Sequence, residues 1–310
     1  MRFQPDEDLS ALLSALDRVL RSDAAGWRVA PDHARHAWSP ALDAQLEASG
    51  FFEAAAEPSL GPVAAAELTR RVAGAPALAE AGASALLRPL ALAAGAPDLP
   101  RPLAVTAGTA PGAAIPFLPV ARAVLRIAPN GVDAAALAPG DAATVPSLFA
   151  YPMGRLVREP DWTRLSVSPD AALARWRVAL AAELAGALQG GLDAVVAHVT
   201  ERRQFGRPLG SFQGVQHRLA ATAARVEGAR LLALRAAQDL CPADAPEALG
   251  HAQRIAGEAV YDLHQFMGAM GLTLEHPLHR WTYRARWLRG ALGGAEANLA
   301  AAADLRWAAA

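Results

Sequence analysis

The residues whose types could do chemistry are densest in one run, Glu201–His217, with the sequence ERRQFGRPLGSFQGVQH. The run joins two predicted helices: one helix ends near Arg203, glycines and a proline form a turn, and Ser211 is expected to cap the next helix. Taken alone, such a charge cluster indicates a solvated helix–turn–helix corner. Nucleic-acid binding is a weaker interpretation, because the rest of the chain is not basic.

This run belongs to a chain of 310 residues that is 53% hydrophobic and 19% charged, with a net charge of −1. The composition supports a large core and two or three domains. No global field attracts nucleic acid or an anionic membrane. The single cysteine, Cys241, excludes a disulfide framework and a cysteine-rich metal site. The N-terminus predicts a mature cytoplasmic protein, and the interrupted apolar stretch Val178–Val199 predicts a buried helix rather than a membrane span.

Helical periodicity is followed by a region rich in proline and glycine. Residues 1–95 predict an N-terminal helical domain, with helices at Asp6–Leu20 and Val63–Val72. Residues 96–168 predict a small β domain, with strands at Ala121–Ile127 and Ser147–Tyr151 and a turn at Pro129–Gly131.

Long helices return after Ser168, which can cap a helix whose first turn holds Pro169. Helices are expected at residues 170–203, 212–240, 244–269 and 290–309. Their lengths favour an antiparallel four-helix bundle over residues 169–310. The sequence therefore predicts a mainly α fold with a small β region, in the order helical, β, helical.

Two stretches of the C-terminal region are too long and unusual to match a known pattern by chance. The string RRQFGRPLGSFQGVQHRLA (202–220) resembles the signature that opens the C-terminal bundle of acyl-CoA dehydrogenases. His264–Arg286 (HQFMGAMGLTLEHPLHRWTYRAR) resembles the family's second block, Q-x-x-G-G-x-G-[FY]-x-x-E-x-P-x-x-R-x-x-R-D-A. The resemblance is strong over residues 170–310 and weak before them. It implies an N-terminal helical domain, a middle β domain that is reduced here, and a C-terminal four-helix bundle.

The resemblance implies α,β-dehydrogenation of an acyl-CoA thioester, with a glutamate as base and FAD as hydride acceptor. It assigns FAD contacts to Arg202 (pyrophosphate), Gln204 (phosphate side), Phe205 (adenine), and Gln265 and Gly268 (adenosine and pyrophosphate). In the family these residues reach FAD bound mainly to the neighbouring subunit, so oligomerisation is part of cofactor binding. Taken singly, Phe205 could be core, Gln265 a helix-surface residue and Gly268 a helix C-cap.

The family's catalytic glutamate is missing from both positions that can hold it. In this register the two positions fall on Leu292 and Trp176, and neither side chain can accept a proton. Glu183, about two helical turns beyond Trp176, and Glu296, just past Leu292, are candidate replacements. The alternatives are a buried polar residue paired with a neighbouring helix for Glu183 and a solvated helix start for Glu296. Glu275 matches the second block's own glutamate and is expected to be structural.

The β region is also shorter than the family's middle domain. Its closest match to the segment that contacts the flavin ring, Ala104–Ala113, lacks the acidic residues, so the flavin-ring contacts cannot be transferred to it. Both losses fall on the parts that a chain needs for its own flavin and its own chemistry. This combination resembles the base-lacking subunit of heteromeric bacterial acyl-CoA dehydrogenases, which form α2β2 assemblies that act on bulky steroid-side-chain thioesters.

The sequence therefore favours a non-catalytic subunit that completes the FAD site of a homologous acyl-CoA dehydrogenase partner. An acyl-CoA substrate and an electron-transferring flavoprotein are partners that the resemblance implies. Two alternatives remain open. The chain could be a self-sufficient homomeric dehydrogenase that uses Glu183 or Glu296 as base, or a family member repurposed for assembly or for other acyl chemistry.

Overall fold

The computed structural model describes residues 5–27, 38–53, 57, 59–96, 98–107 and 112–307. The described chain is mostly helical with a small sheet region, which confirms the predicted fold class. The N-terminal helices are α1 (Glu7–Trp27), α2 (Pro40–Ala48), α3 (Gly61–Gly74) and α4 (Arg88–Ala93), with a π-helical turn, η2 (Ala83–Leu87), leading into α4. Helices α1 and α3 confirm the two helices predicted in this part of the chain.

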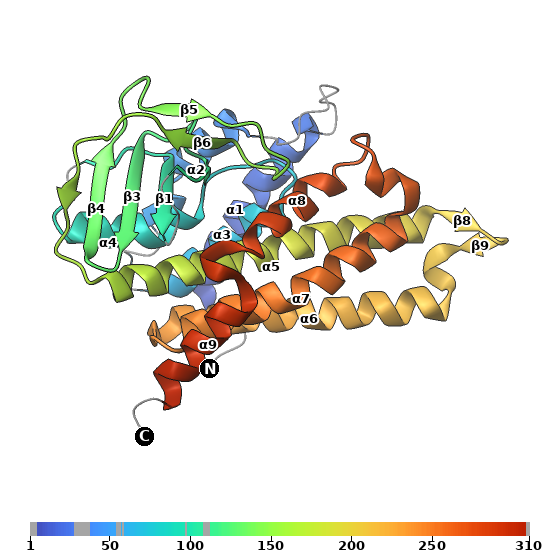
Figure 1. Ribbon diagram of the computed structural model, residues 1–310. Helices are drawn as coiled ribbons and strands as arrows, with labels where there is room; N and C mark the ends of the chain where they lie inside the picture. Colours follow the sequence, from blue (N-terminus) through green and yellow to red (C-terminus); the bar gives the residue numbers. More distant parts are fainter. Residues whose placement is uncertain are drawn as a thin grey trace.

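Two small sheets follow the N-terminal helices (Figure 1). Their strands are β1 (Leu103–Ala107), β2 (Ile115–Pro116), β3 (Ala123–Ala128), β4 (Gly131–Ala136), β5 (Ala142–Thr144), β6 (Met153–Leu156) and β7 (Thr163–Arg164). The first sheet has the order β1-β3-β4-β7, with β1 parallel to β3 and the other pairs antiparallel. The second sheet has the order β2-β6-β5 and is antiparallel.

One of the two predicted strands is confirmed and the other is wrong. Strand β3 and the hairpin reversal across Ala128–Gly131 agree with the predicted strand and turn. The segment Ser147–Tyr151 instead forms bends, and the strand begins only afterwards, as β6. The Ser147 hydroxyl oxygen accepts a hydrogen bond from the Phe149 amide at 3.0 Å. This local contact favours a turn over an extended strand.

The C-terminal region is built from α5 (Pro169–Glu201), α6 (Gln213–Asp239), α7 (Asp244–Met267), α8 (Leu278–Leu288) and α9 (Gly294–Trp307). Helices α5, α6, α7 and α9 confirm the predicted long helices, whereas α8 is an additional helix. The predicted cap of α5 is also confirmed, since Ser168 Oγ accepts from the Ala171 amide at 3.1 Å.

Helix α5 is the centre of the fold, and α3, α6, α7 and α8 all pack against it. Glycines allow the closest approach: a Cβ at Gly186 would lie 2.0 Å from the carbonyl oxygen of Arg70 on α3. By length and composition α5 could cross a membrane, but 78% of its most apolar window is buried inside the fold. It is the buried core helix that its sequence predicts.

Helix α5 also connects two separate regions of the molecule. In Figure 1 the sheets lie beside its N-terminal part, and a two-stranded hairpin, β8–β9, extends beyond its C-terminal end. The candidate functional residues divide between these two regions.

Candidate functional site

The hairpin at the end of α5 is formed by the first signature string. Strands β8 (Arg203–Gln204) and β9 (Arg207–Pro208) pair antiparallel across Phe205 and Gly206. Both turn residues have positive φ, 52° and 80°, as a two-residue type I′ turn requires. A phenylalanine is an unusual choice for this conformation, and its side chain is 86% exposed. The turn geometry does not explain why an aromatic residue stands here, and the one ring contact of Phe205 among the described residues is edge-to-face with Phe212, with ring centroids 6.1 Å apart.

The cations of the hairpin are exposed. Among the described residues the Arg202 guanidinium has no hydrogen-bond or ion-pair partner, whereas Arg203 Nη2 donates to the Gly206 carbonyl at 3.3 Å. The Arg207 guanidinium lies 4.0 Å from the ring centroid of Phe212. The sequence predicted that Ser211 caps α6, and this prediction is wrong. The residue at the N-cap is Phe212, and the Ser211 hydroxyl instead donates to the carbonyl of Pro208 at 2.7 Å.

The second signature stretch lies at the same end of the bundle. Gln265 is exposed in the last turn of α7, and Gly268 follows the helix with a φ of 67°. One apolar cluster joins this end of α7 to the last turns of α5 and to α6 and α8. Its buried members include Val199, Leu219, Met267 and Leu278. The structure thus brings all five predicted FAD-contact residues, Arg202, Gln204, Phe205, Gln265 and Gly268, to one exposed surface, here called the bundle end.

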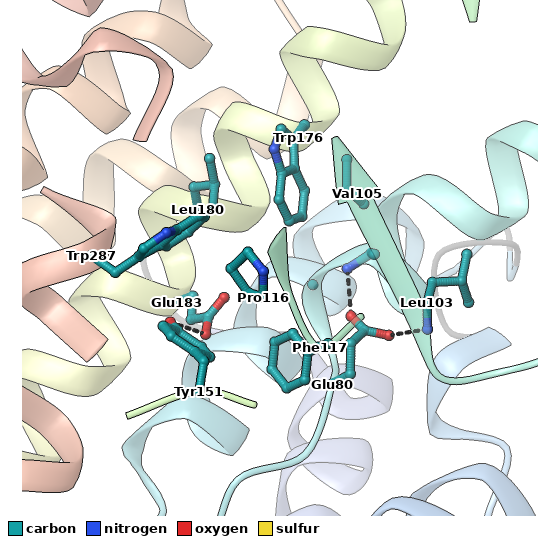
Figure 2. A pocket seen from close by; sticks show the side chains of 12 residues that line it. Glu80, Leu103, Val105, Pro116, Phe117, Tyr151, Trp176, Leu180, Glu183 and Trp287 are labelled. Carbon is teal, nitrogen blue, oxygen red and sulfur yellow. Dashed lines mark hydrogen bonds between the residues drawn. The ribbon is translucent and has the colours of Figure 1, made fainter. Parts of the chain in front are cut away.

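The second region is a cavity where the sheets meet α5 and α8 (Figure 2). Trp176, which the resemblance in sequence aligns with one of the two family base positions, lines it from α5. Phe117, Tyr151 and Trp287 line it from three other segments. The space left between these side chains is about 20 Å³, enough for roughly one water molecule. The place where a base is expected is therefore filled by aromatic side chains.

The aromatic rings of this cavity form a continuous chain of edge-to-face contacts. The ring centroids of Phe117 and Tyr151 are 5.4 Å apart, and those of Tyr151 and Trp287 are 5.6 Å apart. Trp38 extends the chain on the other side, 6.0 Å from Phe117. Such pairs contribute about 0.5–1.5 kcal/mol each beyond the area that they bury. The chain ties the sheet region to the helical bundle.

Glu183 points into the same cavity from α5, on the face that it shares with Trp176, as the helical spacing predicts. Tyr151 Oη donates to Glu183 Oε1 at 2.7 Å. Burial raises the pKa of the Glu183 carboxyl, while this hydrogen bond and the nearby Arg284 guanidinium oppose the rise. Burial also raises the pKa of the Tyr151 hydroxyl, and the Glu183 charge adds to that rise.

The buried Arg284 gives the Glu183 carboxylate a structural task. The Arg284 guanidinium donates to the carbonyls of Arg280, Ala73 and Ala75, at 2.9, 2.8 and 3.1 Å. A buried cation needs a compensating negative charge nearby, and Glu183 supplies one. The contact with Tyr151, however, is made to the segment before β6 rather than to a neighbouring helix.

The other family base position and the remaining glutamates lie elsewhere. Leu292 packs against the same two apolar clusters as Trp176, in a left-handed backbone conformation with a φ of 52°. Glu296 is exposed and pairs with Arg254 at 3.5 Å. Glu275 is also exposed, in the segment before α8. The structure therefore brings Glu183, and not Glu296, to the cavity beside Trp176.

Sequence reasoning missed one carboxylate of the cavity, Glu80. Its Oε1 accepts from the Ala83 amide at 2.8 Å, and the Ser84 hydroxyl donates to Oε2. Arg101, which is fully buried, donates to Ser84 Oγ at 2.7 Å and to Asp43 Oδ1 at 2.9 Å. Burial raises the pKa of the Asp43 carboxyl to about 6, although Arg101 opposes the rise. No local sequence pattern marks these residues, since they come from separate segments.

The stretch expected to lie nearest a flavin ring, Ala104–Ala113, is described only in part. Its first residues lie in β1, where Val105 lines the cavity, and residues 108–111 lie outside the described residues.

Comparison with known proteins agrees with this arrangement. Residues 168–304 match the family described as acyl-CoA dehydrogenase, C-terminal domain. This region of the chain is therefore similar to the C-terminal domain of acyl-CoA dehydrogenases. Acyl-CoA dehydrogenase FadE34 of Mycobacterium tuberculosis is 36% identical over 154 residues, which are 47% of this chain but only 22% of that relative. The chain thus matches well under two thirds of the length of this curated relative.

Solved structures show that the likeness in fold extends over nearly the whole chain. The ChsE4-ChsE5 complex from Mycobacterium tuberculosis is similar with a TM-score of 0.79 and 21% identity, over 97% of each chain. The Tcur3481-Tcur3483 steroid ACAD is similar with a TM-score of 0.75 and 24% identity, over 98% of this chain and 99% of that one. The described fold is therefore that of acyl-CoA dehydrogenases, including the parts outside the matched C-terminal domain.

Proposed function

We propose that this chain is the non-catalytic subunit of a heteromeric, FAD-dependent acyl-CoA dehydrogenase, and that its bundle end completes the FAD site of a homologous partner. The observation that carries the proposal is the cavity. Neither family base position, Trp176 or Leu292, bears a carboxylate, and aromatic side chains fill the space beside Trp176. Both similar structures named above carry paired names, which supports an assembly of unlike subunits.

The residues of the bundle end fit an anionic dinucleotide. Arg202 offers a planar guanidinium with no partner among the described residues, and such a group binds phosphate oxygens in a bidentate manner. Phe205 offers an exposed ring on which a base can stack. A Cβ at Gly268 would meet nothing within 4 Å, so its surface is open. FAD, when bound, supplies the acceptor for the hydride of dehydrogenation; the residues of this chain would hold its adenosine and pyrophosphate parts.

Glu183 supports a second candidate, a self-sufficient dehydrogenase with an unusual base. Glu183 lies beside Trp176 in the cavity, and its raised pKa is a feature that catalytic bases share. Its contacts favour a structural role, because the carboxylate is already committed to Tyr151 and lies near Arg284. The cavity also lacks room for a thioester, since small-molecule sites commonly span about 300–1,000 Å³.

The isosteric variant Glu183→Gln separates the two candidates. Gln keeps an acceptor for Tyr151 but cannot remove a proton. The wild-type chain and Glu183→Gln would each be purified alone with added FAD, and turnover of octanoyl-CoA and of a steroid-side-chain thioester measured with an artificial electron acceptor. We expect neither preparation to turn over either substrate, whereas wild-type turnover that falls about a hundredfold or more in Glu183→Gln would identify Glu183 as the base.

A further inference from the structure

We infer that Trp176 and Trp287 exclude acyl thioesters from this chain sterically, so that a restored carboxylate would not by itself restore a substrate site. The inference rests on the proposed function and adds a second, independent reason why the chain is inactive. The absence of a base prevents proton abstraction, but it does not prevent a substrate from binding. The side chains that fill the cavity leave no space for the substrate.

The cavity lies at one of the two family base positions. Trp176 lines the cavity, and Leu292 packs against both apolar clusters that Trp176 contacts. The base position at Trp176 therefore lies in the cavity, whereas Leu292, 116 residues further along the sequence, is not one of the residues that line it. A substrate whose α-carbon could reach the Trp176 position would have to occupy the cavity.

The cavity is too small to hold an acyl chain. Its free space is about 20 Å³, roughly one water molecule. Figure 2 shows the Trp176 ring between α5 and β1 and the Trp287 ring on the α8 side of the cavity, with Tyr151 and Phe117 below them. Both indoles would have to move aside before a chain of several methylene groups could enter.

Contacts among the lining residues hold the cavity closed. Tyr151 packs edge-to-face on both Trp287 and Phe117. Its hydroxyl is fixed by Glu183 at 2.7 Å. The Trp176 ring lies against the η2 side, where a Cβ at Gly82 would be 3.8 Å from its Cζ3. Displacing one indole therefore disturbs several mutually supporting contacts.

The test compares binding of octanoyl-CoA to the full chain by isothermal titration calorimetry. The variants are Leu292→Glu, which restores a carboxylate at the other family base position and leaves both indoles in place, and Trp176→Leu and Trp176→Ala, which open the cavity. Trp281→Leu is the matched control. It removes an indole from the separate apolar cluster beneath the bundle end, where Trp281 Nε1 donates to the Gly74 carbonyl at 3.0 Å. Circular dichroism confirms that each variant is folded, and Trp176→Leu retains an apolar side chain in case Trp176→Ala unfolds.

We expect the opened variants to bind octanoyl-CoA at least about tenfold more tightly than the wild-type chain, Leu292→Glu and Trp281→Leu. Wild-type or Leu292→Glu chain that binds as tightly as the opened variants would overturn the inference. So would an opened, folded variant that gains no affinity. These outcomes are separate from the proposed function, which is read from flavin content and turnover in the complex and could hold even if the cavity admitted the ligand.

Discussion

The bundle end and the cavity differ in the contacts that their polar and aromatic side chains make. At the bundle end an arginine has no partner among the described residues, a phenylalanine is exposed in a left-handed turn, and the glycine beyond α7 faces open space. In the cavity the rings of Phe117, Tyr151 and Trp287 pack on one another, and Tyr151 and Glu183 form a hydrogen bond. The exposed groups of the bundle end are accessible to a ligand, whereas the groups of the cavity are held by one another. This difference agrees with the proposal that the bundle end binds FAD and that the cavity contributes to stability.

The largest expected effect is on stability near the cavity. Arg101→Met should lower the free energy of unfolding by about 3–5 kcal/mol, because it leaves the buried Asp43 carboxylate and the Ser84 hydroxyl without their common donor. The matched change Arg202→Met, at the bundle end, should stay within about 0.5 kcal/mol. Urea denaturation of the two variants measures this difference, and equal losses would break the comparison between the two regions.

The next effect is on FAD retention, which a substitution at the bundle end should lower more than a substitution in the sheet region. In the complex with a homologous subunit, Arg202→Met should weaken FAD retention about ten- to hundredfold, because charge-assisted hydrogen bonds to the pyrophosphate are lost. Arg155→Met is the control, since Arg155 is also an exposed arginine but lies on β6. Dialysis against dilutions of FAD with absorbance detection gives the affinity. Equal flavin retention in both variants would remove Arg202 from the cofactor site.

The last prediction concerns the turn, where two opposing contributions to stability nearly cancel. Phe205→Asn relieves a left-handed conformation worth about 1–2 kcal/mol, but it loses the edge-to-face contact with Phe212, worth about 0.5–1.5 kcal/mol. The net change in unfolding free energy should therefore be below about 1 kcal/mol, while FAD retention in the complex falls. Phe205→Tyr keeps the ring and should retain flavin. If Phe205→Asn binds FAD as well as Phe205→Tyr does, the exposed ring has no part in binding.

The parts of the fold that the sequence predicted are those specified by local patterns. The apolar content of α5, the cap at Ser168 and the reversal before Gly131 depend on residues close together in the chain. The strand expected at Ser147–Tyr151 failed because apolar residues alone do not distinguish a strand from bends that bury the same side chains. Helix α8 was missed because its apolar positions lie between charged and polar residues, several of which are buried by tertiary contacts.

The candidate site divides in the same way. The bundle-end residues come from two short stretches, so a resemblance in sequence is enough to group them. The cavity is assembled from α5, α8 and segments around β1, β2 and β6, and the fit between Trp176, Tyr151 and Trp287 exists only after the chain has folded. The resemblance in sequence predicts that a base is missing at Trp176 and Leu292. It could not predict that aromatic side chains fill the space beside Trp176.

The most direct test of the central claim is the flavin spectrum of the wild-type chain purified alone and purified with a homologous subunit that carries the family base. We expect the chain purified alone to be colourless. We expect the complex to be yellow, with a flavin absorbance near 450 nm that is bleached by an acyl-CoA substrate that fits the partner. A yellow solo preparation that an acyl-CoA bleaches would contradict the account, because it would show that this chain holds its own flavin and performs its own chemistry.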